Sequence, residues 1–146
     1  MPRRQPEPHT YYLDANLDGP ELLGRLRDSG MRCERHRDHF AQNAKDEAWI
    51  PEIAAKGWII VTRDVAIQRR PAERSAWIST GAVVIMVRGN RLSAEEIARM
   101  LLTAHAGGRL DDFISKRVTP MVIHLHPDGH FEVREGQLPR APVSGQ

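Results

Sequence analysis

Apolar residues in this chain fall into short unbroken runs, separated by segments of helical spacing. Residues 58–62 (WIIVT) and 82–87 (AVVIMV) are continuous and rich in β-branched residues, the pattern of strands that are buried on both faces of a sheet. A shorter run at residues 11–13 ends at Asp14, and residues 31–36 predict a second, more polar strand. The runs therefore predict a sheet whose central strands are fully buried.

Helical spacing fills the segments between these strands. Residues 20–30 predict one helix, which opens on proline and stops at glycine, the usual asymmetry of helix ends. Residues 46–56 predict a second helix, with Pro51 near enough to its start to be tolerated. Residues 93–105 begin with the capping pattern S-x-x-E and predict another. A basic helix is also expected after Asp64.

Strands that alternate with helices predict a mostly parallel sheet covered on both faces, in a three-layer α/β/α domain. Near the end of the chain, residues 122–126 and 130–134 flank Pro-Asp-Gly and predict a β-hairpin. We assign residues 10–135 to this single domain. Residues 1–9 and 136–146 are rich in Pro, Gly, Arg and Gln, and we expect them to be disordered tails.

The bulk composition narrows the class of protein only slightly. The formal net charge is +2 and the pI is about 9.0, a balance that permits nucleic-acid binding without requiring it. Arginines far outnumber lysines, which suits phosphate recognition and equally fits a high-GC genome. A single cysteine excludes an intramolecular disulfide, and no apolar run reaches the roughly 20 residues that span a bilayer. Without a secretory signal, the protein is expected to be cytoplasmic.

Three aspartates stand where chemistry is expected in such a fold. Asp14 and Asp64 each follow an apolar strand, and ligands of open α/β sheets bind at the carboxyl ends of the strands. Asp46 begins the helix before the second of these strands and can reach the same edge. Clustered carboxylates repel one another unless a cation offsets them, and Mg²⁺ or Mn²⁺ prefers their oxygens. The alternative is ordinary turn and helix-capping chemistry.

The order of the segments adds a second argument. The chain contains YYLDANL, then KDEAWIPEIAAKGWIIVTRD, then AVVIMVRG, and this series resembles the PIN-like toxin ribonucleases over residues 10 to 126. The resemblance implies a metal-dependent endoribonuclease, the toxin of a type II toxin–antitoxin pair, with RNA (including tRNA) as substrate. It also implies a cognate antitoxin protein and the formation of homodimers.

The resemblance assigns roles position by position. Asp14, Asp46 and Asp64 would hold Mg²⁺ or Mn²⁺, and Glu47 would be the fourth acid or a partner of the ligands. Asp46 or Glu47 would act as general base. Two further residues, Asn16 and Thr62, would orient ligands or water.

One feature of the sequence departs from the family pattern. Many PIN nucleases carry another acid after the next strand, where this chain has Arg88-Gly89-Asn90. A PIN-like module that binds RNA or protein without cutting therefore stays open as an alternative. A receiver-like signalling domain is a weaker rival, because Lys116 is poorly placed for the lysine such domains need.

Arginines surround the third aspartate. As phosphate clamps they would position RNA beside the metal without reading its sequence, and as a solvated helix face they would do nothing specific. The four candidates are Arg63, Arg69, Arg70 and Arg74, and Arg88 and Arg91 follow the next strand.

The remaining candidates are histidines and aromatic residues. Pairing across the predicted hairpin places four side chains on one face, either as a transition-metal site or as a polar outer surface; they are His124, His126, His130 and Glu132. Cys33 and His36 would point to opposite faces of a strand, which argues against a zinc site there. Each tryptophan either stacks a base or packs a helix on the sheet, and Leu102 with its neighbours belongs either to the core or to a partner groove.

Overall fold

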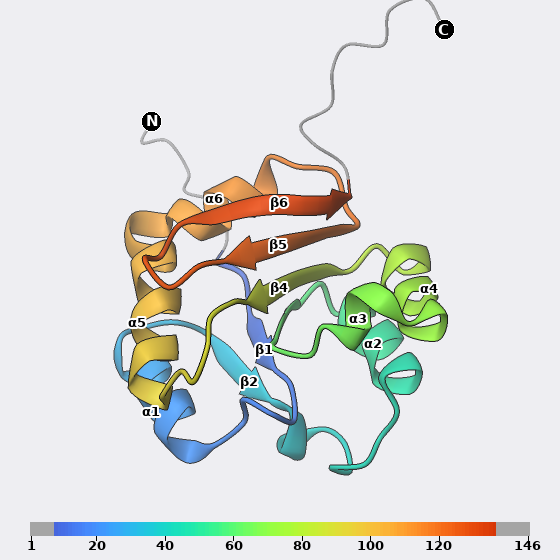
Figure 1. The fold of residues 1–146 in the computed structure, drawn as a ribbon, viewed down its shortest axis with the longest axis horizontal. Coiled ribbons are helices and arrows are strands. Elements are labelled where there is room, and N and C mark those ends of the chain that lie inside the picture. Colours follow the sequence, from blue (N-terminus) through green and yellow to red (C-terminus); the bar gives the residue numbers. More distant parts are fainter. Residues whose placement is uncertain (1–7, 137–146) are drawn as a thin grey trace, which may run out of the picture.

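The computed structural model describes residues 8–136 and is built around one six-stranded sheet (Figure 1). The strand order is β2-β1-β3-β4-β5-β6, with β1 to β5 parallel and β6 antiparallel to β5. The predicted α/β fold with a mostly parallel sheet and a C-terminal hairpin is thus confirmed. The strands are β1 (Tyr11–Leu13), β2 (Cys33–Arg35), β3 (Ile59–Thr62), β4 (Val83–Val87), β5 (Met121–Leu125) and β6 (Phe131–Gly136).

Helices cover both faces of the sheet, as Figure 1 shows. One face packs against α1 (Pro20–Asp28), α5 (Ala94–His105) and α6 (Arg109–Ser115). The other packs against α2 (Asp46–Ala55), α3 (Ala66–Arg69) and α4 (Pro71–Ser79). Two short 3-10 turns, η1 (His36–Asp38) and η2 (Ala106–Gly108), complete the connections.

The core explains why the central strands read as unbroken apolar runs. Side chains along each strand alternate between two buried clusters, one on each face of the sheet. Tyr11 and Leu13 contribute to the cluster under α1 and α5, whereas Tyr12 between them contributes to the cluster under α2 and α4. All five residues of β4 are buried in the same alternating way.

The segment after Asp64 differs from the prediction of one basic helix. Two helices occupy it, α3 and α4, and the backbone between them is extended at Arg70. Pro71 causes the break, because a proline disfavours the helical conformation of the residue before it. The helix α6 is an addition that the sequence pattern did not predict, since it is only seven residues long.

The hairpin forms as predicted, with a loop of three residues. His126 N–H donates to the His130 carbonyl at 2.8 Å. Gly129 has a φ of +88°, and a Cβ atom on it would lie 2.5 Å from Cγ2 of Thr103 on α5. Glycine is therefore required both for the turn and for the close approach of the hairpin to α5.

The predicted tails lie almost entirely outside the described residues. Of the rest, His9 donates its backbone N–H to Asp111 Oδ1 at 3.2 Å, and Gly136 is the last residue of β6. None of the helices between residues 8 and 136 has the length and apolar character needed to cross a membrane.

Candidate metal centre

Three predicted acids meet at the carboxyl edge of the parallel sheet. Asp14 follows β1 directly, and Asp64 follows the neighbouring strand β3 after one residue. Asp46 is the first residue of α2. The charges of Asp46 and Asp64 both raise the pKa of Asp14, so the three carboxylates lie within electrostatic reach of one another.

Asp14 is the buried member of the group, with 5% of its surface exposed. Burial raises its pKa to about 6, against the lowering effect of its hydrogen bonds to Thr62 and Asn16. Thr62 Oγ1 donates to one carboxylate oxygen, and the backbone N–H of Asn16 donates to the other at 3.0 Å. The same Thr62 hydroxyl accepts the Asp64 backbone N–H at 2.9 Å, and it therefore links the ends of β1 and β3.

Asp46 and Asp64 are more open and each uses one oxygen within the protein. Asp64 Oδ1 accepts the backbone N–H of Ala66 at 2.9 Å and so supports the start of α3. Asp46 Oδ1 accepts the indole N–H of Trp49 at 3.0 Å. Burial raises the pKa of Asp46, the Trp49 hydrogen bond lowers it, and the Asp64 charge raises it again.

Glu73 is a fourth acid in this region, and the sequence analysis did not identify it. It lies in the first turn of α4, is 7% exposed, and its charge raises the pKa of Asp46. Its cationic neighbour is Arg70, whose Nη1 is 3.7 Å away and whose side chain is 73% exposed. The predicted fourth acid, Glu47, has an exposed side chain on α2, and its charge also raises the pKa of Asp46. The packing of α4 on α2 is what brings Glu73 near Asp46. The spacing of apolar residues in the sequence does not predict such a tertiary contact.

The donor set fits a hard divalent cation in kind and in charge. Within residues 8–136, the Oδ2 atoms of Asp46 and Asp64 accept no hydrogen bond from the protein. As the side chains are oriented, however, no three His, Cys, Asp or Glu residues of this region surround a common metal position. Asp46 and Asp64 are half-buried, and Mg²⁺ is usually held by one or two carboxylates, with water and substrate phosphate as its other ligands.

The four predicted RNA-binding arginines have different surroundings. Arg63 donates to the carbonyls of Val87 at 3.3 Å and Gly89 at 2.9 Å, which joins the ends of β3 and β4. Arg74 donates to Glu135 of β6 at 2.6 Å. The other two are exposed: Arg69 is the last residue of α3, and Arg70, which follows it, lies 3.7 Å from Glu73.

The histidine face of the hairpin has the predicted pairing. His124 lies opposite Glu132, and His126 and His130 stack with ring centroids 5.7 Å apart. Protein groups contact these rings, since His124 Nε2 lies 2.8 Å from Gln68 Oε1 and His126 Nε2 lies 2.8 Å from a Glu132 oxygen. The face therefore works as a polar surface that ties the hairpin to α3.

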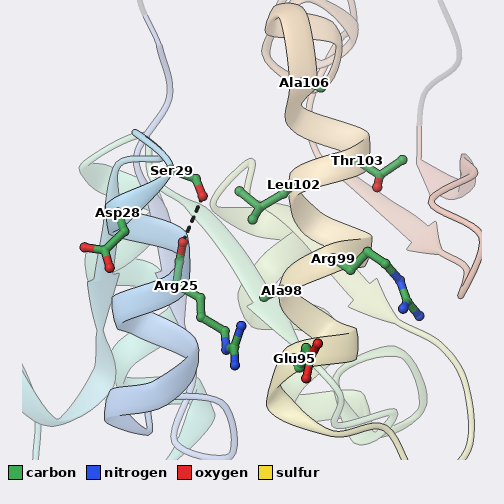
Figure 2. A pocket seen from close by; sticks show the side chains of 9 residues that line it. All are labelled: Arg25, Asp28, Ser29, Glu95, Ala98, Arg99, Leu102, Thr103 and Ala106. Atoms are coloured by element: carbon green, nitrogen blue, oxygen red, sulfur yellow. Dashed lines mark hydrogen bonds between the residues drawn. The ribbon is translucent and has the colours of Figure 1, made fainter.

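The aromatic and apolar candidates mostly pack in the core. Trp49 and Trp77 are 2% and 1% exposed in the cluster under α2 and α4. On α5, Leu101 is buried and Leu102 is half-buried. Leu102 extends from α5 toward α1 in a groove between the two helices (Figure 2). The groove is lined by Arg25, Asp28, Ser29, Glu95, Ala98, Arg99, Leu102, Thr103 and Ala106.

A smaller hollow adjoins the acidic edge. It lies between the segment after β1 and the start of α5, and its lining includes Asn16, Leu17, Leu92 and Ile97. Asn16 thus donates its backbone N–H to Asp14 and is also one of the residues that line this hollow.

Comparison with known proteins is consistent with this arrangement. A family described as "PIN like domain" matches residues 10–89, a span that includes all four acids at the edge. A protein of Mycobacterium tuberculosis (strain ATCC 25618 / H37Rv) with the name "Putative ribonuclease VapC45" is 31% identical over 121 residues. The match covers 80% of this chain and 85% of that protein. No solved structure matches the chain significantly.

Proposed function

This chain belongs to the PIN-like domain family, and from that premise we propose that it is a divalent-metal-dependent endoribonuclease of the toxin type. One observation carries the proposal. A carboxylate that is 5% exposed, Asp14, lies beside Asp46 and Asp64 at the strand edge where α/β folds bind ligands. A bound cation offsets the mutual repulsion that otherwise makes this arrangement unfavourable.

The surroundings of each residue determine its proposed role in the site. Asp14, Asp46 and Asp64 hold the ion, and the Thr62 hydroxyl fixes the orientation of Asp14. Mg²⁺ or Mn²⁺, when bound, supplies a water of lowered pKa and neutralises charge at the phosphorus. Asp46 or Glu47 would accept the proton of the attacking water.

The substrate and partner follow from the family and from charge. Arg69 and Arg70 are exposed beside the acids, and as phosphate contacts they position an RNA backbone without selecting its sequence. The similarity to the mycobacterial protein supports RNA as the substrate. As a toxin, the enzyme would be kept inactive by a cognate antitoxin protein.

A second candidate function is RNA binding without cleavage. Arg88-Gly89-Asn90 follows β4 in place of a further acid, and one oxygen each of Asp46 and Asp64 is already occupied by a protein donor. This alternative requires the same surface and the same arginines, so only turnover separates the two.

Cleavage of a mixed tRNA and total-RNA pool with Mg²⁺ or Mn²⁺ is the test. The native chain is compared with Asp14→Asn and Asp64→Asn, and with Asp112→Asn as a matched control on α6, where the carboxylate pairs with Lys116 at 2.9 Å. We expect metal-dependent cleavage that both edge variants lose and the control keeps. RNA that is bound by the native chain but never cut contradicts the nuclease proposal.

A further inference from the structure

We propose that Trp49 is a positioning residue for Asp46, holding one carboxylate oxygen through its indole N–H so that the other is presented to the cation. The proposal rests on the proposed function, because it assigns a purpose to the orientation of one acid of that site. It concerns a side chain that sequence reasoning treated as packing or base stacking.

The hydrogen bond itself is well defined. Trp49 Nε1–H donates to Asp46 Oδ1 at 3.0 Å, from a position three residues further along α2. The indole is 2% exposed, whereas Asp46 is half-buried and begins the helix. An aspartate at such a place is free to rotate, and a fixed donor on one oxygen selects a single orientation. Groups that orient metal ligands in this way raise metal affinity.

Trp49 is in turn held by an aromatic cluster at the end of β1. Its ring lies 5.2 Å from that of Tyr12 and 5.8 Å from that of His36, measured between centroids. His36 Nε2 lies 3.0 Å from the Ala41 carbonyl, which only accepts, so this nitrogen carries the proton. The Nδ1 atom therefore accepts the Tyr12 hydroxyl, at 2.5 Å.

The aromatic cluster is a second connection between the acidic edge and the sheet, in addition to Asp14. Tyr12 is the middle residue of β1, and Asp14 directly follows the strand. The Asp14 N–H still donates to the Val61 carbonyl of β3 at 3.1 Å, so the alternation of the strand places Tyr12 and Asp14 on the same face of the sheet. Asp14 reaches the site directly, and Tyr12 reaches it through Trp49 and Asp46. The positions of two proposed metal ligands, Asp14 and Asp46, therefore both depend on contacts with β1.

The chain offers a matched control for this hydrogen bond. Trp77 is 1% exposed in the same core cluster, and its Nε1–H donates to the Ile67 carbonyl at 2.8 Å. Trp77→Phe removes an indole donor of equal burial whose acceptor is a main-chain carbonyl. Trp49→Phe removes the donor to Asp46 and keeps a ring in the core.

The test measures Mg²⁺ affinity by calorimetry and follows the three indole N–H resonances of the full chain by NMR during the same titration. We expect Trp49→Phe to weaken Mg²⁺ binding about tenfold or more, and Trp77→Phe to change it by less than about twofold. In the unmodified protein, the Trp49 indole resonance should shift saturably with Mg²⁺ while that of Trp77 stays in place. This readout needs no variant and does not respond to a loss of stability.

The outcomes separate this inference from the proposed function. If the native chain binds Mg²⁺ and Trp49→Phe binds it equally well, or if the Trp49 resonance does not move, the positioning role is wrong and the metal site stands. If the native chain binds neither Mg²⁺ nor Mn²⁺, both are wrong.

Discussion

Asp14 illustrates how a functional residue opposes stability. Its pKa is about 6 in the folded chain, because burial raises it from 3.8. Between pH 4 and 6 the unfolded chain loses this proton while the folded chain keeps it, so the free energy of unfolding falls as the pH rises through that interval. Above pH 6 the loss amounts to about 2–3 kcal/mol.

The first prediction follows from this decrease in stability with rising pH. In EDTA at pH 8, Asp14→Asn should raise the free energy of unfolding by about 1–3 kcal/mol, since an amide avoids the buried charge. Urea unfolding between pH 4 and 8 measures it, and the variant should lose the fall in stability from pH 4 to 6. A variant that is less stable than the native chain at pH 8, with the same pH profile, contradicts this account.

A second prediction at this scale compares two glutamates. Glu73 is buried beside Asp46, and Glu47 is exposed to solvent, which screens its charge. Glu73→Gln should therefore weaken Mg²⁺ binding more than Glu47→Gln does, in calorimetric titrations of the two variants. The reverse order would show that the acid predicted from the sequence is the fourth member of the site.

Residues of the site were predictable to different degrees. Asp14, Asp46 and Asp64 follow from their places at strand ends and at a helix start, which the apolar pattern locates. The approach of Glu73 to Asp46 depends on how α4 packs on α2, a tertiary contact with no local period, so the sequence could not indicate it. The bond between Trp49 and Asp46 lies within α2 at a spacing of three residues. That spacing makes the two side chains neighbours on the helix but does not show that the indole N–H points to the carboxylate.

At the scale of elements, the predicted helix boundaries agree with the structure where residues at the helix end itself mark the boundary. Capping patterns and glycines located the ends of α1, α2 and α5 to within one or two residues. The sequence pattern did not predict helix α6, and it predicted one helix where α3 and α4 form. These helices are short, and each lies next to a break in the helical backbone. Tertiary contacts rather than periodicity stabilise helices of that length.

The hairpin provides the prediction for this scale. Gly129→Ala should cost about 2–4 kcal/mol of unfolding free energy, because positive φ and a collision with Thr103 act together. Gly30→Ala is the matched control, since Gly30 has a φ of +89° and a Cβ atom added to it would meet no atom within 4 Å. About 1 kcal/mol is expected there. Thermal unfolding of both variants measures the difference, and equal losses would exclude a close approach between hairpin and α5.

At the scale of the whole molecule, charge is distributed unevenly around a nearly neutral chain. The net charge of +2 gives little general attraction for RNA, so binding must depend on local cations next to the acidic edge. Arg63 and Arg74 are engaged in contacts with other elements, whereas Arg69 and Arg70 are exposed.

The corresponding prediction concerns salt dependence. Replacing Arg69 and Arg70 together by serine should lower RNA affinity and reduce the slope of log K against log salt by about 1–2. Stability should change little, because the Arg70 side chain that pairs with Glu73 is 73% exposed. Arg74→Ser should instead lower stability, because it breaks the 2.6 Å contact with Glu135. Fluorescence anisotropy with a labelled RNA at several salt concentrations checks the slope, and an unaltered slope in the double variant places the RNA elsewhere.

Binding of Mn²⁺ followed by electron paramagnetic resonance tests the central claim most directly, since the signal of the free ion disappears when it is bound. The account predicts a saturable site in the native chain and in Asp112→Asn, and its loss in Asp14→Asn and Asp64→Asn. Asp14→Asn is expected to be at least as stable as the native chain without metal, so unfolding would not explain that loss. Equal binding in all four proteins, or none in the native chain, would contradict a metal centre at this edge of the sheet.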